Sequence, residues 1–174
     1  MRLGNHARRC IDVIAMLDIP DPFDVTALVR QIAAGRARPI VLKPITTGDS
    51  APSGFWVAAR TKDYICYEAD TAKLHQEHII LHELGHMLCE HNTPADSHEL
   101  LAQILLPTLD PAVVRKVLAR TAYSHPEEEQ AELFATLVLG QAGRFSIRKM
   151  RANSPEMLAL LDRIEQAIAP TKPR

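Results

Sequence analysis

Apolar residues recur at helical spacing near the start of the chain. Ile11, Ile14 and Leu17 lie three residues apart and predict a helix over residues 7–17. The two prolines that follow end this helix, because proline cannot continue a helix and biases its predecessor toward an extended backbone.

The next segments predict a second helix and then a strand. Asp24 is a suitable N-cap for a helix over residues 25–34, and Gly35 provides a stop beyond its end. Residues 39–45 are short, β-branched and bounded by prolines, which predicts a strand. The glycine, serine and proline residues of 46–53 then predict a loop.

Two further β-prone segments predict a hairpin. They cover residues 54–59 and 64–68 and flank residues 60–63, a connection of the length found in four-residue hairpin loops. The sheet should therefore contain about three strands, at least two of them antiparallel.

Helical patterns dominate the rest of the chain. Asp70 or Thr71 could cap a long helix that runs to about residue 90. Further helices are predicted over residues 97–105, 111–122, 127–139 and 155–167. A few strands followed by many helices predict an α+β fold, in which a small sheet packs on a mainly helical body.

Composition adds limits to this picture. The chain has 174 residues, 47% hydrophobic and 24% charged, with a formal net charge of −1. This size suits one domain, 1–174, comprising N-terminal helices (1–38), the sheet and long helix (39–93) and a helical C-terminal part (94–174). The near-neutral charge argues against direct nucleic-acid binding.

No apolar run approaches the length of a membrane span, and the N-terminus does not resemble a secretory signal. Three cysteines without a Cys-x-x-Cys pair suit free thiols in a reducing compartment. We therefore expect a cytoplasmic protein without membrane contact.

The candidate chemistry lies in His82-Glu83-Leu84-Gly85-His86, within the predicted long helix. At about 100° per residue, His82 and His86 project from one stripe, one turn apart, as two ligands of a tetrahedral zinc ion require. Glu83 lies beside that stripe, where it could accept a proton from zinc-bound water. Gly85 would allow another backbone to approach closely.

Other potential ligands surround this motif. His75 and His78 precede it on the same general face, and we interpret them as supporting or solvated residues, although either could be a ligand. Cys89 lies about 60° from His86 on the helix, and we interpret it as a small buried apolar residue rather than a ligand of a structural zinc site.

A catalytic zinc ion takes three protein ligands, so a third must come from elsewhere. The helix predicted from residue 127 offers four carboxylates, which belong to Glu127, Glu128, Glu129 and Glu132. Glu128 lies within about 120° of the apolar residues of this helix, whereas periodicity alone does not rank Glu127 and Glu129. Acidic residues here also complement the helix dipole.

Two separated motifs resemble the ImmA/IrrE family of zinc metallopeptidases. They are His82-Glu83-Leu84-Gly85-His86 and Glu128-Glu129-Gln130-Ala131-Glu132-Leu133-Phe134-Ala135, and the resemblance covers about residues 24–139. It implies a zincin-like body in which Glu83 is the general base and Zn²⁺ is held by His82, His86 and Glu128. The 41 residues between His86 and Glu128 imply an inserted helical segment. The Leu-Met-Pro sequence that commonly follows Phe-Ala in the family is replaced by residues 136–140.

The resemblance also implies a function. The chain would be an intracellular zinc-dependent endopeptidase that acts on a helix-turn-helix repressor in a stress-response or mobile-element system. The hairpin could align an extended substrate by strand addition. Spacing does not choose an oxyanion donor among Tyr64, Tyr67, Tyr123 and His125.

Two other functions stay open. One is a non-catalytic, zinc-binding regulatory or toxin-like partner of a transcription regulator, and the other is a zinc hydrolase acting on small peptides or cell-wall fragments. The basic cluster Arg144, Arg148, Lys149 and Arg151 is interpreted as a solvated face, and the oligomeric state is not predicted.

Overall fold

The computed structural model describes residues 5–46, 53–59, 61–91 and 123–144. Within them the chain forms α1 (Asn5–Ala15), α2 (Val25–Gly35), β1 (Ile40–Ile45), β2 (Gly54–Ala58), β3 (Asp63–Glu68), α3 (Lys73–Leu88) and α6 (His125–Gln141). The α+β prediction is confirmed, because the described part combines four helices with one three-stranded mixed sheet. The helices predicted over 97–105, 111–122 and 155–167 lie outside the described residues, and the three-part division of the chain stays a prediction.

The sheet has the order β1-β3-β2, so the last strand in sequence occupies the centre. The predicted hairpin is confirmed: β2 pairs antiparallel with β3, from Gly54 opposite Tyr67 to Ala58 opposite Asp63. Strand β1 pairs parallel with β3, with Ile40 opposite Asp63. The sequence pattern did not predict this parallel pair.

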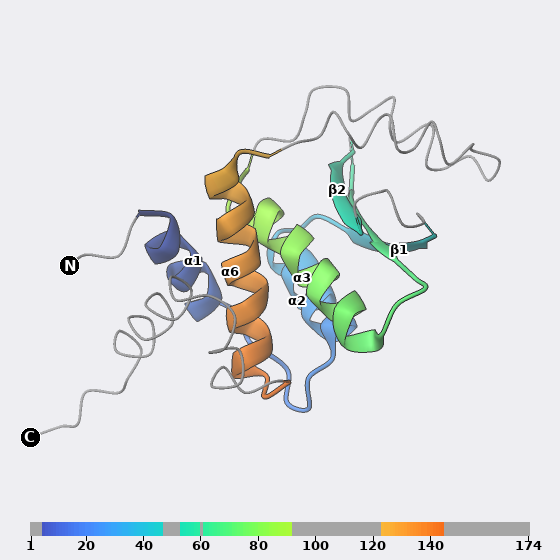
Figure 1. Cartoon of the computed structure of the whole chain (residues 1–174), viewed down its shortest axis with the longest axis horizontal. Helices are drawn as coiled ribbons and strands as arrows, with labels where there is room; N and C mark the ends of the chain where they lie inside the picture. Colours follow the sequence, from blue (N-terminus) through green and yellow to red (C-terminus); the bar gives the residue numbers. More distant parts are fainter. Residues whose placement is uncertain (1–4, 47–52, 60, 92–122, 145–174) are drawn as a thin grey trace, which may run out of the picture.

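Helix α3 lies at the centre of the described part of the chain (Figure 1). One side packs against β2 and β3, and another packs along α6, which in turn contacts α1. Buried Leu81 and Leu84 of α3 join Leu28 of α2, Ile65 of β3 and Phe134 of α6 in one apolar core. Packing against the sheet and against α6 therefore fixes the position of α3 on two sides.

The two ends of α2 differ in how well the sequence predicted them. As predicted, Asp24 caps the N-terminus, and its Oδ1 accepts from the backbone N–H groups of Thr26 and Ala27 at 2.7 and 3.1 Å. The predicted stop at Gly35 is wrong, because Gly35 is the last helical residue. The left-handed residue that closes the helix is Ala37, with φ of 49°.

The long helix begins later than predicted. Neither Asp70 nor Thr71 caps it: α3 starts at Lys73, and its N-cap residue, Ala72, has no side chain that could form a capping hydrogen bond. The turn before the helix is instead held by Gln76, whose side-chain amide donates to the backbone carbonyl oxygens of Ala69 and Thr71.

Helix α6 begins earlier than predicted, at His125, because Ser124 and Glu127 form a capping box. Both the backbone N–H and the hydroxyl of Ser124 donate to Glu127 Oε2 at 2.8 Å. No helix in the described segments combines the length and apolar character needed to span a bilayer.

Candidate metal centre

Helix α3 directs two imidazoles toward α6. The Nε2 atoms of His82 and His86 lie 3.0 Å apart, as expected for residues one turn apart on one helix face. His86 is 1% exposed and His82 is 20% exposed, so the pair lies at the edge of the core and can still be reached from solvent.

The four candidate glutamates at the start of α6 point in different directions. Glu127 caps its own helix, and Glu129, 70% exposed, pairs with His125 on the surface. Glu128 and Glu132 face α3. The structure thus distinguishes residues that periodicity could not rank, and it places Glu128 beside the histidine pair.

The carboxylate of Glu128 reaches both imidazoles. Its Oε2 lies 3.3 Å from His82 Nε2, and its Oε1 lies 3.7 Å from His86 Nε2. These three side chains form a group that could hold a metal ion. They are the three residues that the resemblance in sequence implies as zinc ligands, and α3 and α6 bring them together across 41 intervening residues.

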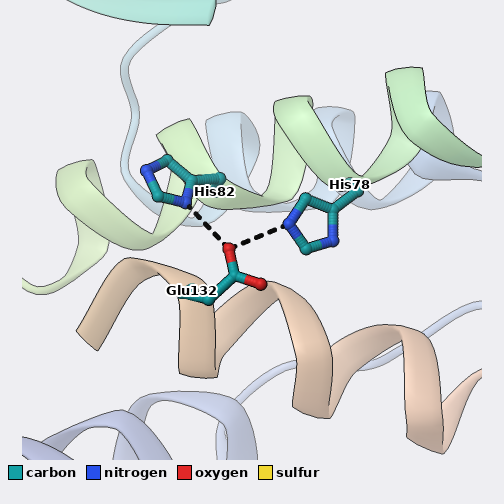
Figure 2. A group of neighbouring side chains, drawn as sticks. All are labelled: His78, His82 and Glu132. Atoms are coloured by element: carbon teal, nitrogen blue, oxygen red, sulfur yellow. Dashed lines mark hydrogen bonds and ion pairs between the residues drawn. The ribbon is translucent and has the colours of Figure 1, made fainter. Parts of the chain in front are cut away.

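A second group of side chains adjoins the first (Figure 2). Glu132 Oε2 lies between two rings of α3, at 3.0 Å from His78 Nε2 and 3.6 Å from His82 Nδ1. His78, His82 and Glu132 also satisfy the distance criterion for a metal site. However, His82 belongs to both groups, and one imidazole can ligate two ions only by losing both ring protons.

The alternative role for Glu132 is to orient His82. Nδ1 of His82 faces Glu132 at 3.6 Å, an ion-pair distance longer than a hydrogen bond, and with its proton on that side Nε2 is left to face Glu128 and His86, as in carboxylate–histidine–metal triads. Burial alone would lower the pKa of His82, but the interaction with Glu132 and the charges of Glu83 and Glu128 raise it. Interactions with the side chains of His78 and His82 lower the pKa of Glu132 to about 2.

His86 is enclosed by aromatic rings. Its ring stacks on Tyr123, with centroids 3.7 Å apart, and its Nδ1 lies 2.8 Å from Nδ1 of His91. Burial, together with the neighbouring rings of His82 and His91, lowers the pKa of His86 to about 3. A neutral imidazole is the form that binds metal ions.

Close helix packing holds the two halves of the site together. A Cβ atom at Gly85 would lie 3.0 Å from Ala131 Cα and 3.2 Å from Phe134 Cβ, so the predicted close backbone approach at Gly85 is confirmed. At the other end of the contact between α3 and α6, Arg144 donates to both carboxylate oxygens of buried Glu77. Together these contacts fix the position of α6 relative to α3, and so of Glu128 relative to the histidines.

Glu83 lies on the face of α3 that packs against β2, next to the face that carries the histidines. It is 5% exposed, its Oε2 has no hydrogen-bond partner, and Trp56 hydrogen-bonds to it through the backbone. Strand β2 approaches it at Gly54, where a Cβ atom would lie 3.2 Å from Glu83 Oε1. Burial, supported by the charge of Glu128, raises the pKa of Glu83 to about 7.

The unpartnered oxygen of Glu83 indicates whether these residues suit a metal site. A buried carboxylate oxygen without a partner is costly, and such atoms are rare unless a water, an ion or a catalytic role explains them. A metal-bound water beside Glu83 would satisfy it. The residues present therefore fit a metal ion with a bound water.

The remaining candidates lie elsewhere. Cys89 is buried but belongs to neither of the two groups of described residues that could hold a metal ion, and burial raises its pKa to about 11. Tyr64 is buried in the cluster formed with Phe55, Val57 and Cys66. Of the four potential oxyanion donors, Tyr123 is the one whose ring contacts a candidate ligand.

The sequence pattern offered Glu132 as one of four candidate third ligands, and it gave no role at the site to Gly54, His91 or Gln130. One available signal was spacing: Glu128 and Glu132 are four residues apart, like His78, His82 and His86, so two helices can match these faces. His91 and Gln130 had no comparable signal, because their contact depends on how α3 ends.

No family model, curated protein or solved structure matches the chain, so its site is interpreted from its own geometry.

Proposed function

We propose that the protein is a zinc-dependent endopeptidase, with His82, His86 and Glu128 as ligands and Glu83 as general base. The observation that carries this proposal is the approach of Glu128 to both imidazoles of the His-Glu-x-x-His helix. Two histidines and one glutamate are a ligand set of catalytic zinc sites, which keep a fourth position for water.

The distances support zinc. With metal–ligand bonds of about 2.0–2.1 Å and tetrahedral angles, neighbouring ligand atoms lie about 3.3 Å apart. The separations among the three side chains are 3.0, 3.3 and 3.7 Å, which bracket this value. Small side-chain adjustments would therefore suffice to complete the site.

Zinc at this position would polarise a substrate carbonyl and lower the pKa of a bound water toward about 7. Glu83 then accepts the proton of the attacking water through its free Oε2 and passes it to the departing amine. Its raised pKa, about 7, lets it both take up and release that proton near neutral pH.

A peptide substrate suits the position of β2. In the described part of the sheet, β2 pairs on one side alone, and it passes directly against Glu83 at Gly54 and Trp56. An extended peptide that added to this edge would carry its backbone past the proposed base. The resemblance to ImmA/IrrE peptidases supports a helix-turn-helix repressor, acting in trans, as the substrate.

The test is incubation of the zinc-loaded protein with the helix-turn-helix regulator encoded nearest to it, followed by mass analysis of the products. We expect discrete fragments from the wild type, none after zinc chelation and none from Glu83→Gln, which should still bind one zinc ion. Glu129→Gln is the matched control, since Glu129 pairs with His125 on the surface, and it should cleave like the wild type.

Cleavage by zinc-loaded Glu83→Gln would refute the general-base assignment. A wild type that binds zinc and the regulator without cutting it would favour the non-catalytic regulatory partner instead.

A further inference from the structure

We infer that His91 and Gln130 are positioning residues that hold His86 in the tautomer with its proton on Nδ1, which leaves the Nε2 lone pair for the metal. This inference rests on the proposed zinc site, because it explains how one of its ligands is prepared. None of the sequence motifs includes His91.

The three side chains form a continuous buried chain of hydrogen bonds. His86 Nδ1 lies 2.8 Å from His91 Nδ1, and His91 Nε2 lies 2.9 Å from Gln130 Oε1. The three residues are 1%, 7% and 3% exposed, so water does not compete for these groups. Both distances are those of full hydrogen bonds.

The amide oxygen of Gln130 sets the direction of donation along these hydrogen bonds, because a carbonyl oxygen can only accept. His91 must therefore carry a proton on Nε2, and with that single ring proton its Nδ1 has a lone pair. That lone pair accepts from Nδ1–H of His86. The neutral ring of His86 has one proton, so its Nε2 is unprotonated and can bind a metal.

The opposite direction would disable the site. If the amide nitrogen of Gln130 faced His91, the protons would shift, and His91 would donate to Nδ1 of His86. His86 would then carry its proton on Nε2, the atom that faces His82 and Glu128. The orientation of one buried amide thus decides whether His86 is a ligand.

The end of α3 places His91 for this role. The helix closes in a Schellman motif: Glu90 is left-handed, with φ of 58°, and the backbone N–H of His91 donates to the carbonyl oxygen of His86 at 3.0 Å. This bond brings His91 next to His86, whose ring it contacts. Gln130 comes from α6, two residues after Glu128, so the same helix supplies a ligand and orients another.

The tautomer can be measured without zinc and without activity. In metal-free wild-type protein with ¹⁵N-labelled histidine, long-range ¹H–¹⁵N spectra distinguish protonated from unprotonated ring nitrogens. We expect His86 to show protonated Nδ1 and unprotonated Nε2, and His91 to show protonated Nε2. Protonated Nε2 and unprotonated Nδ1 on neutral His86 would overturn the inference, and this measurement needs no variant to fold.

Zinc affinity, measured by competition with a chromogenic chelator, provides the second readout. Loss of a partner that orients a ligand weakens metal binding by about 10–100-fold, and we expect this for His91→Phe. His91→Asn, whose amide oxygen can accept from His86, should recover part of the loss. The control is His75→Phe, because His75 is exposed and stacks on His78 without contacting a ligand, and it should bind like the wild type.

The possible failures are distinguishable. Wild-type zinc affinity in His91→Phe, with His86 protonated on Nε2, would overturn the positioning role and leave the zinc site intact. A wild type that binds no zinc would overturn the proposed function and this inference with it.

Discussion

Replacing Gly85 by alanine tests whether close contact between α3 and α6 builds the metal centre. A Cβ atom at this position would lie 3.0 Å from Ala131 Cα and 3.2 Å from both Ala131 O and Phe134 Cβ. These contacts are several tenths of an ångström too short, and two of them involve the backbone of α6. A rotamer change cannot relieve them, so the helices must separate.

The two energetic effects of this substitution have opposite signs. Alanine within a helix is favoured over glycine by about 1 kcal/mol. Inserting a methyl group into a packed contact costs about 1–3 kcal/mol. We therefore expect the free energy of unfolding of the metal-free protein to fall by about 1 kcal/mol, the opposite of what helix propensity predicts.

Separation of the helices should also weaken the site, because α6 carries Glu128 and α3 carries both histidines. We expect tenfold weaker zinc binding, which corresponds to a loss of about 1.4 kcal/mol in binding free energy. Urea unfolding gives the stability, and chelator competition gives the affinity.

Gly35→Ala is the matched control for Gly85→Ala. Gly35 is also helical, but a Cβ atom there meets nothing within 4 Å, so Gly35→Ala should stabilise the protein and leave zinc affinity unchanged. If Gly85→Ala is also more stable than the wild type and binds zinc equally well, the argument from helix contact is wrong.

Three further predictions each concern one residue. Glu132→Gln should weaken zinc binding by about 10–100-fold in the same competition assay, because it removes the carboxylate that orients His82; unchanged affinity would argue against that role. Ala37→Gly should raise the free energy of unfolding by about 0.5–1 kcal/mol in urea, since Ala37 has a left-handed backbone that glycine adopts without strain; a lower value would contradict this. The pKa of His86 is lowered to about 3 in the folded protein from 6.5 as its ordinary value, so the unfolded chain binds more protons at this residue between these values, and the stability that His86 contributes is lost as pH falls from 6.5 toward 3. Glu83, whose pKa is raised to about 7, contributes in the opposite direction, so the readout is the difference in urea midpoint between the metal-free wild type and His86→Gln; a difference that stays constant over that range would refute the assignment.

Elements defined by local contacts were predicted well. The Asp24 cap of α2 depends on hydrogen bonds to backbone groups two and three residues away, and the hairpin of β2 and β3 depends on a short connection. The start of α3 was predicted wrongly, because Gln76 holds the preceding turn from inside the helix and no capping side chain is needed. The parallel pairing of β1 with β3 was not predicted, since it joins strands that are not adjacent in sequence.

The sequence by itself determined that His82 and His86 share one helix face with Glu83 beside them, because a helical repeat fixes the relation of residues one turn apart. Only the tertiary structure decided which glutamate meets that face. The choice of Glu128 over its neighbours depends on the rotation of α6 against α3, which is set where Gly85 meets Ala131. The orientation of His86 likewise depends on a turn after α3 and a side chain from α6. Packing between segments distant in sequence controls both features, and the periodicity of either segment alone does not contain that information.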